Sequence, residues 1–154
     1  MAALDVLSRS LFEDIVASAE ACDVVLPGCR YVSHCAPALD CCDVMAFYPD
    51  VITNDVSVSG VKCLISPNVT FVLELWWCVS VPENMVNGFV TPDPSITTLE
   101  SLEMQDSAYT VFTAAIDAVN SSSCGAVINA RLECLDPQGG CAGWKITFTT
   151  KLEA

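Results

Sequence analysis

The stretch NVTFVLELWWCVSV, residues 68–81, decides the fold because its two alternating faces differ in character. One face is apolar throughout and consists of Phe71, Leu73, Leu75, Trp77, Val79 and Val81. The opposite face mixes polar and apolar side chains, namely Thr70, Val72, Glu74, Trp76, Cys78 and Ser80. A period of two with one continuous apolar face predicts a long sheet strand that packs that face on the core.

Three further strands are predicted on either side of this stretch. Residues 43–52 predict a strand that is interrupted at Pro49, a position that fits an edge, a bulge or a strand end. Residues 126–135 and 143–152 predict a hairpin, with its turn at residues 136–140.

Two segments have helical spacing. Residues 3–21 predict a helix whose apolar stripe is Leu4, Leu7, Leu11, Ile15 and Ala19, widened by Phe12 and Val16. Residues 96–119 predict a second helix, in which Thr97 and Glu100 have the spacing of a capping box. Its predicted stripe is Leu102, Tyr109, Phe112, Ile116 and Val119, with Ala108 and Ala115 permitting close approach.

These elements predict a single domain over residues 1–154 with an α+β fold. We expect two layers: a mostly antiparallel sheet of about four strands, and two helices packed on it, in the order α-β-β-α-β-β. Residues 22–42 are expected to form a cysteine-bearing connector. Residues 53–68 and 82–95 are expected to form long loops that act as contact arms.

The composition favours a folded acidic domain. The chain has 154 residues, of which 53% are hydrophobic, and this excludes disorder for most of it. Nineteen acidic residues against six basic ones give a net charge of −13. Such a surface repels nucleic acid and anionic membranes, although simple solubility explains it equally well.

Nothing in the sequence predicts export or membrane insertion. The first residues, MAALD, lack the basic and apolar regions of a signal peptide. The most apolar stretch, residues 69–81, is too short to span a bilayer and contains Glu74. We therefore expect synthesis in a cytosol, where thiols stay reduced.

Ten cysteines are present, at positions Cys22, Cys29, Cys35, Cys41, Cys42, Cys63, Cys78, Cys124, Cys134 and Cys141. This density is typical of a disulfide scaffold or a metal site. The cluster from Cys22 to Cys42 contains no C-x-x-C pair, and three interpretations stay open for it: a local disulfide, a closed zinc site, or buried thiols that pack as small apolar groups. Cys134 and Cys141 flank the hairpin turn and would form a bridge if the register opposes them.

No catalytic, cofactor-binding or metal-ligating residues are predicted, and the chain is not expected to be an enzyme. The sole histidine, His34, is expected to be a solvated connector residue. Four aspartates surround the strand at residues 43–52, but nothing in their spacing makes them converge: Asp40, Asp43, Asp50 and Asp55.

Trp76 presents a separate question because it points away from the apolar face. A large aromatic side chain on the second face needs cover, either from the connector or from another subunit. The connector is the favoured explanation.

Three segments give the chain a family resemblance. They are residues 29–43, ending in Asp40-Cys41-Cys42-Asp43; residues 73–82, with Trp77-Cys78 and Val81-Pro82; and residues 139–144, Gly-Gly-Cys-Ala-Gly-Trp. In this order, and together with the two helices, they resemble the cysteine-rich tail terminator family of siphophages that infect actinobacteria. The resemblance covers most of the chain.

The resemblance implies a structural virion protein at the head–tail junction, assembled in the host cytoplasm. Such proteins form a hexameric ring that caps the tail tube, stops its polymerisation and meets the head connector or stopper protein. DNA passes through the lumen without specific binding, which an acidic surface favours. Alternatives are a head-side stopper or a tail tube subunit and, from a different class, a cysteine-rich or zinc-binding module.

Overall fold

The computed structural model shows an α+β fold with two helices on a five-stranded sheet. It describes residues 4–36, 43–53, 67–79, 85–86, 89–90, 94–122, 126–138 and 141–151. The helices are α1 (Leu4–Glu20) and α2 (Pro94–Ser121). The strands are β1 (Cys29–Val32), β2 (Val44–Thr53), β3 (Asn68–Cys78), β4 (Met85–Val86), β5 (Phe89–Val90), β6 (Val127–Gln138) and β7 (Cys141–Lys151).

The main sheet has the order β1-β2-β3-β7-β6, and β4 and β5 pair separately. β3, the strand predicted most directly, lies at the centre between β2 and β7, antiparallel to both. β6 continues the sheet antiparallel to β7, whereas β1 runs parallel to β2 at the other edge. The sheet is therefore mixed, and it has one strand more than the sequence predicts.

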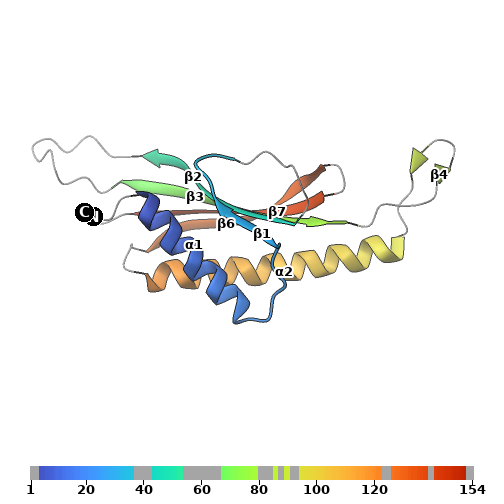
Figure 1. Ribbon diagram of the computed structural model, residues 1–154, viewed down its shortest axis with the longest axis horizontal. Coiled ribbons are helices and arrows are strands. Elements are labelled where there is room, and N and C mark those ends of the chain that lie inside the picture. Colours follow the sequence, from blue (N-terminus) through green and yellow to red (C-terminus); the bar gives the residue numbers. More distant parts are fainter. Residues whose placement is uncertain are drawn as a thin grey trace, which may run out of the picture.

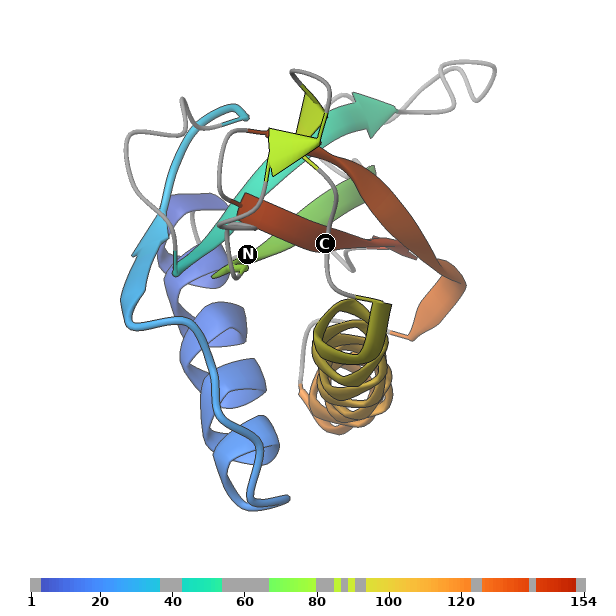
Figure 2. The same ribbon diagram turned by 90° about the vertical axis from the view of Figure 1, so that its right-hand side faces the viewer.

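Both helices lie on the same side of the main sheet, as Figure 2 shows when the molecule is viewed along α2. The core fills the space between the two layers. At its centre the ring of Phe47 stacks on Phe12 of α1 and on Phe71 of β3, with ring centroids 5.8 and 5.1 Å away. Burial of each such ring contributes about 1.5–3 kcal/mol to stability, so these contacts hold the two layers together.

The alternation of β3 is confirmed along its length. Phe71, Leu73 and Leu75 are fully buried under the helices, and Trp77 packs partly against the same core. Trp76 lies on the opposite, helix-free face, yet it is only 2% exposed within a single chain. No second subunit is needed to cover it.

The first helix follows the prediction closely, and the second does not. The stripe of α1 is buried as expected, including Leu11, Ile15 and Ala19. α2 begins at Pro94, a residue suited to a first helical turn, so the proposed capping box lies inside the helix. Leu102 and Tyr109 were predicted to face the core, but they are exposed because α1 packs on the C-terminal part of α2 (Figure 1).

β1 is a strand inside the segment predicted as a connector. Its four residues are too short to show a period, and they pair with residues 44–47 of β2, directly after Asp43. Asp43 has a φ of 58°, and its carbonyl accepts a hydrogen bond from the Cys29 amide at 2.9 Å. Its carboxylate accepts another from the Cys78 amide at 3.3 Å. A single aspartate, a residue type that tolerates positive φ, thus joins β1, β2 and β3.

The predicted features of β2, of the β6–β7 hairpin and of the two long loops can be compared with the structure. The interruption at Pro49 is a bulge, since the β2–β3 register shifts between Pro49 and Val51. The hairpin of β6 and β7 is confirmed, but it is longer than predicted because residues 136–138 belong to β6. The predicted contact arms fall largely on residues 54–66 and 80–93, most of which lie outside the described residues.

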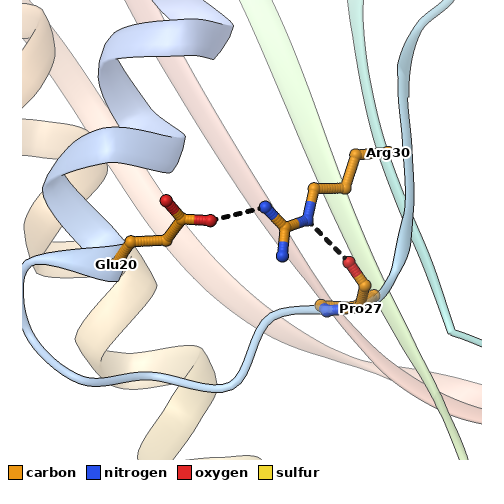
Figure 3. Close-up of polar contacts among 3 residues, drawn as sticks. All are labelled: Glu20, Pro27 and Arg30. Carbon is orange, nitrogen blue, oxygen red and sulfur yellow. Dashed lines mark hydrogen bonds and ion pairs between the residues drawn. The ribbon is translucent and has the colours of Figure 1, made fainter.

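Figure 3 shows how the end of α1 is tied to β1. The Arg30 guanidinium donates through Nη1 to Glu20 Oε1 at 2.6 Å and through Nε to the Pro27 carbonyl at 2.9 Å. One side chain therefore fixes both the helix terminus and the turn that follows it.

In the described part of the chain, neither helix is both long and apolar enough to cross a membrane.

Candidate functional site

A groove lies between the N-terminal half of α2 and the β6–β7 hairpin. We call it the α2 groove. It has a volume of about 540 Å³ and is lined by Leu102, Gln105, Asp106, Tyr109, Leu132 and Trp144. Its walls come from segments about 30 residues apart in the chain, and its lining is largely apolar.

The α2 groove exists because α2 is longer than the layer that covers it. In its C-terminal half, Val111, Ala115 and Val119 are buried between α1 and the sheet. The N-terminal half extends beyond α1 (Figure 1), and there Leu102 and Tyr109 remain 58% and 60% exposed. Large apolar side chains gathered at one place on a surface are typical of a protein–protein contact.

The floor of the α2 groove is contributed by the sheet. Leu132 and Trp144 lie on the helix-facing side of β6 and β7 and are partly buried against the core. Tryptophan and tyrosine are enriched where interfaces are tightest, and both are present here. Asp106 supplies the charge on the rim. The arrangement can bind an apolar surface.

The second notable cluster lies on the helix-free face of the sheet and is buried. The Tyr48 hydroxyl donates to Glu74 Oε2 at 2.6 Å, and the Trp76 indole N–H donates to Glu74 Oε1 at 3.1 Å. Each carboxylate oxygen thus has a donor, as a buried carboxylate requires. Among the described residues Glu74 is the only buried carboxylate.

This network changes the chemistry of Tyr48. Burial is the main cause that raises the pKa of the Tyr48 hydroxyl above its ordinary value, and the hydrogen bond to the Glu74 carboxylate raises it further. The hydroxyl therefore stays protonated and acts as a donor. Across the sheet Glu74 lies opposite Lys145, which in turn lies opposite Glu133. The cluster links β2 to β3 through the hydrogen bond from Tyr48 to Glu74.

The described cysteines of the Cys22–Cys42 cluster are neither bonded to one another nor buried. Cys22, Cys29 and Cys35 are exposed free thiols, so no two of them are bonded. Cys41 and Cys42 lie outside the described residues. Cys134 is also a free thiol, and it lies opposite Trp144 rather than Cys141. The proposed Cys134–Cys141 bridge is therefore wrong, because the hairpin register does not oppose the two residues.

Cys141 is disulfide-bonded, and Cys78 Sγ lies 3.8 Å from Asp43 Oδ2. Nowhere in the described segments do three His, Cys, Asp or Glu side chains gather to hold a metal ion. Asp43 binds Cys78, as described above, and Asp50 is exposed further along β2. Asp40 and Asp55 lie outside the described residues. His34 is exposed, as predicted.

Two features of these sites escape sequence reasoning. The partnership of Tyr48, Glu74 and Trp76 depends on the β2–β3 register, which alternation alone does not specify. The α2 groove depends on where α1 ends relative to α2. Its one available signal was the surplus of apolar residues near the start of α2, including Ile96 and Leu99, both exposed.

Comparison with known proteins adds nothing to this description. No protein-family model matches the chain, and no curated protein matches it. The geometry of the α2 groove and the two sheet faces therefore carries the functional proposal.

Proposed function

We propose that this chain is a structural subunit of a siphophage virion, a tail terminator that forms a ring on the end of the tail tube. The observation that carries the proposal is the α2 groove, a large apolar surface left open on a small acidic domain. A subunit of a closed assembly needs such a surface, because its neighbour supplies the missing cover.

A ring requires two different surfaces on each subunit, since its contacts are heterologous. The α2 groove lies beside β6, at one edge of the main sheet. At the opposite edge, where β1 lies, the exposed apolar side chains include Val32 of β1 and Val25, which precedes it. We assign the groove of one subunit to the β1 edge of the next, so that repeated contacts of one kind close into a cycle.

The charge of the chain suits a conduit for DNA. The net charge is −13, and among the described carboxylates all but Glu74 keep some contact with solvent. A basic lumen would hold phosphates by counterion release, whereas an acidic one lets DNA pass. The tube protein and the head connector or stopper are the proposed partners at the two ring faces.

The oligomeric state of the purified protein tests this function. Native mass spectrometry and negative-stain imaging should show a closed ring, either of the protein alone or on the ends of isolated tail tubes. A protein that stays monomeric in both conditions would exclude the terminator role. An assembled ring with a basic lumen would exclude the charge argument while leaving the ring intact.

A second candidate is the tube subunit itself. The length of the β6–β7 hairpin, with strands of 12 and 11 residues, favours it. Against it, the hairpin does not project, because β7 is paired on both sides within the sheet. The same imaging separates the two functions, since a tube subunit polymerises into long tubes and a terminator stops at one ring.

A further inference from the structure

β6 forms one edge of the main sheet, with β7 as its single neighbour in the described part of the chain. An edge strand directs alternate backbone N–H and C=O groups outward, where another strand can pair with them. The β6–β7 register is regular from Asn129 to Leu135 and shifts at both ends of this range. Bulges interrupt strand pairing, so the segment open to a further strand is residues 129–135. Asn129, Arg131 and Cys134 are exposed along it.

The sequence of this segment is complementary to itself when two copies run antiparallel. Its central residue is Leu132, which lies between Arg131 and Glu133. A two-fold axis at Leu132 places Arg131 of each copy opposite Glu133 of the other. Opposite charges directly across two strands stabilise the pair, and like charges destabilise it. A shift of the register by two residues in either direction places arginine opposite arginine or glutamate opposite glutamate, so the charges also select the register.

Arg131 and Glu133 already contact each other within one chain. Arg131 Nε lies 2.9 Å from Glu133 Oε1, and the two side chains are 64% and 42% exposed. The contact lacks hydrogen-bond geometry, since Glu133 Oε1 has no hydrogen-bond donor among the described residues. A guanidinium presents five N–H donors. Nη1 and Nη2 of Arg131 can therefore reach Glu133 of the second copy while Nε stays beside its own.

The charge distribution also favours this edge for a contact between two copies. Two chains with a net charge of −13 repel each other over most of their surface. The helices contribute to this repulsion, because α1 and α2 carry eight acidic residues and one basic residue. β6 and β7, in contrast, carry three of the six basic residues of the chain against two acidic ones: Arg131, Lys145 and Lys151 against Glu133 and Asp136. Repulsion between copies is therefore weaker at the hairpin than at the helices.

We propose that β6 pairs with β6 of a second copy about a two-fold axis at Leu132, so that two five-stranded sheets become one. Backbone hydrogen bonds along residues 129–135 and two Arg131–Glu133 pairs between the copies hold the contact. Ala130 of each copy then lies opposite Cys134 of the other. The inference does not rest on the proposed function: this contact is isologous, whereas the contacts within a ring are heterologous. Where a ring also forms, the β6 pairing joins two rings.

The mass of the particle tests the pairing, measured by native mass spectrometry and sedimentation velocity in the presence of reductant. Pairing doubles the mass, from one subunit to two or from one ring to two. Arg131→Glu leaves only acidic charges on the segment and Glu133→Arg leaves only basic ones, so each variant should pair with itself roughly tenfold more weakly or worse. An equal mixture of the two variants should pair again, because each then meets opposite charges.

Arg9→Glu is the matched control, since it makes the same charge change as Arg131→Glu at an exposed position of α1. It should pair as the unmodified protein does. Circular dichroism checks that all three variants are folded.

Cys134 gives a second readout in the unmodified protein. Its thiol is exposed in the single chain, but it lies opposite Ala130 of the second copy in the pair. Alkylation by excess N-ethylmaleimide, followed by peptide mass spectrometry, should therefore be slower at Cys134 in a concentrated solution than in a dilute one. Cys29, an exposed thiol on β1, should react at the same rate in both.

Several results would overturn the proposal. One is an unmodified protein whose mass never doubles and whose Cys134 reacts equally fast at all concentrations. Another is Arg131→Glu and Glu133→Arg variants that each pair normally, or whose mixture fails to pair. Equal weakening by Arg9→Glu would assign the effect to net charge instead of to β6. Single rings that never pair would exclude the β6 contact and leave the terminator role intact, so the two failures are distinguishable.

Discussion

The indole ring of Trp76 lies against the backbone of Gly143, its partner across the β3–β7 pair. A Cβ atom at position 143 would be 2.8 Å from Trp76 Cδ2 and 2.6 Å from the Leu75 carbonyl oxygen. Both distances are shorter than real Cβ contacts. The glycine in the run at residues 139–144 is therefore required by the close approach of an aromatic ring on the helix-free face.

Gly143→Ala should destabilise the fold by about 1–3 kcal/mol, because the added methyl group overpacks a buried site. The matched control is Gly28→Ala, since no atom lies within 4 Å of a Cβ built there. Urea unfolding monitored by tryptophan fluorescence measures both. Equal unfolding midpoints for the two variants would contradict the packing described for Trp76.

Tyr48→Phe should cost about 1–3 kcal/mol, because it leaves Glu74 Oε2 buried without its donor. Tyr109→Phe is the control, since the Tyr109 side chain is exposed and should lose little. A lower urea unfolding midpoint for Tyr48→Phe, with an unchanged midpoint for Tyr109→Phe, supports the network. An unchanged midpoint for Tyr48→Phe would mean that solvent reaches Glu74.

The raised pKa of Tyr48 predicts a loss of stability in alkali. An unfolded tyrosine releases its proton near pH 10, whereas folded Tyr48 retains it. Stability from this group is therefore complete below about pH 10 and falls above it, by up to about 1.4 kcal/mol per pH unit. Tyr48→Phe should show a shallower decline than Tyr109→Phe when unfolding is measured from pH 9 to 11. If the stability of the two variants declines equally between pH 9 and 11, this prediction is wrong.

Leu102→Glu should leave the subunit folded and weaken ring assembly more than tenfold, because it places a charge in an apolar contact. Ser101→Glu adds the same charge at an exposed position of α2 that does not line the groove. Analytical ultracentrifugation measures assembly, and thermal unfolding measures the subunit. If both variants assemble equally well, the α2 groove is not the subunit contact.

The contacts of Arg30 predict unequal effects of two substitutions. Glu20→Gln removes only a partly exposed ion pair and should cost less than about 1 kcal/mol, vanishing in high salt. Arg30→Ala also removes the hydrogen bond to the Pro27 carbonyl and should cost more, at any salt concentration. Unfolding at low and high sodium chloride compares the two. Identical costs would show that the bond to Pro27 does not contribute.

The sequence was sufficient to predict the elements that have a clear period. The apolar face of β3 and the stripe of α1 were predicted correctly because each is a local pattern, although β3 is also buried on its second face from Val72 to Trp76. β1 could not be predicted in this way, since its four residues are too short to show a period and are defined by their parallel pairing with β2. Leu102 and Tyr109 continue the helical period of α2, but periodicity does not reveal how far the covering layer extends.

The candidate sites depend even more on non-local pairing. The sequence shows a glycine at position 143, but only the β3–β7 register, which places it opposite Trp76, explains why a glycine is needed there. The partnership of Tyr48 with Glu74 requires the β2–β3 register in the same way. Composition gave the acidic surface directly, because net charge does not depend on how the chain folds.

The central position of β3 has a consequence for synthesis of the protein. One neighbour, β2, precedes it in the chain, but the other, β7, is close to the end: the hydrogen bond between the Thr70 and Thr149 hydroxyls, 2.9 Å long, spans 79 residues. Contacts of such separation make folding slow, and they form only after β7 has been synthesised. A nascent chain lacking β7 leaves one side of β3 without its neighbour. The sheet is therefore completed only once β7 is present, and a chain truncated near residue 140 would be an aggregation-prone fragment instead of a shortened domain.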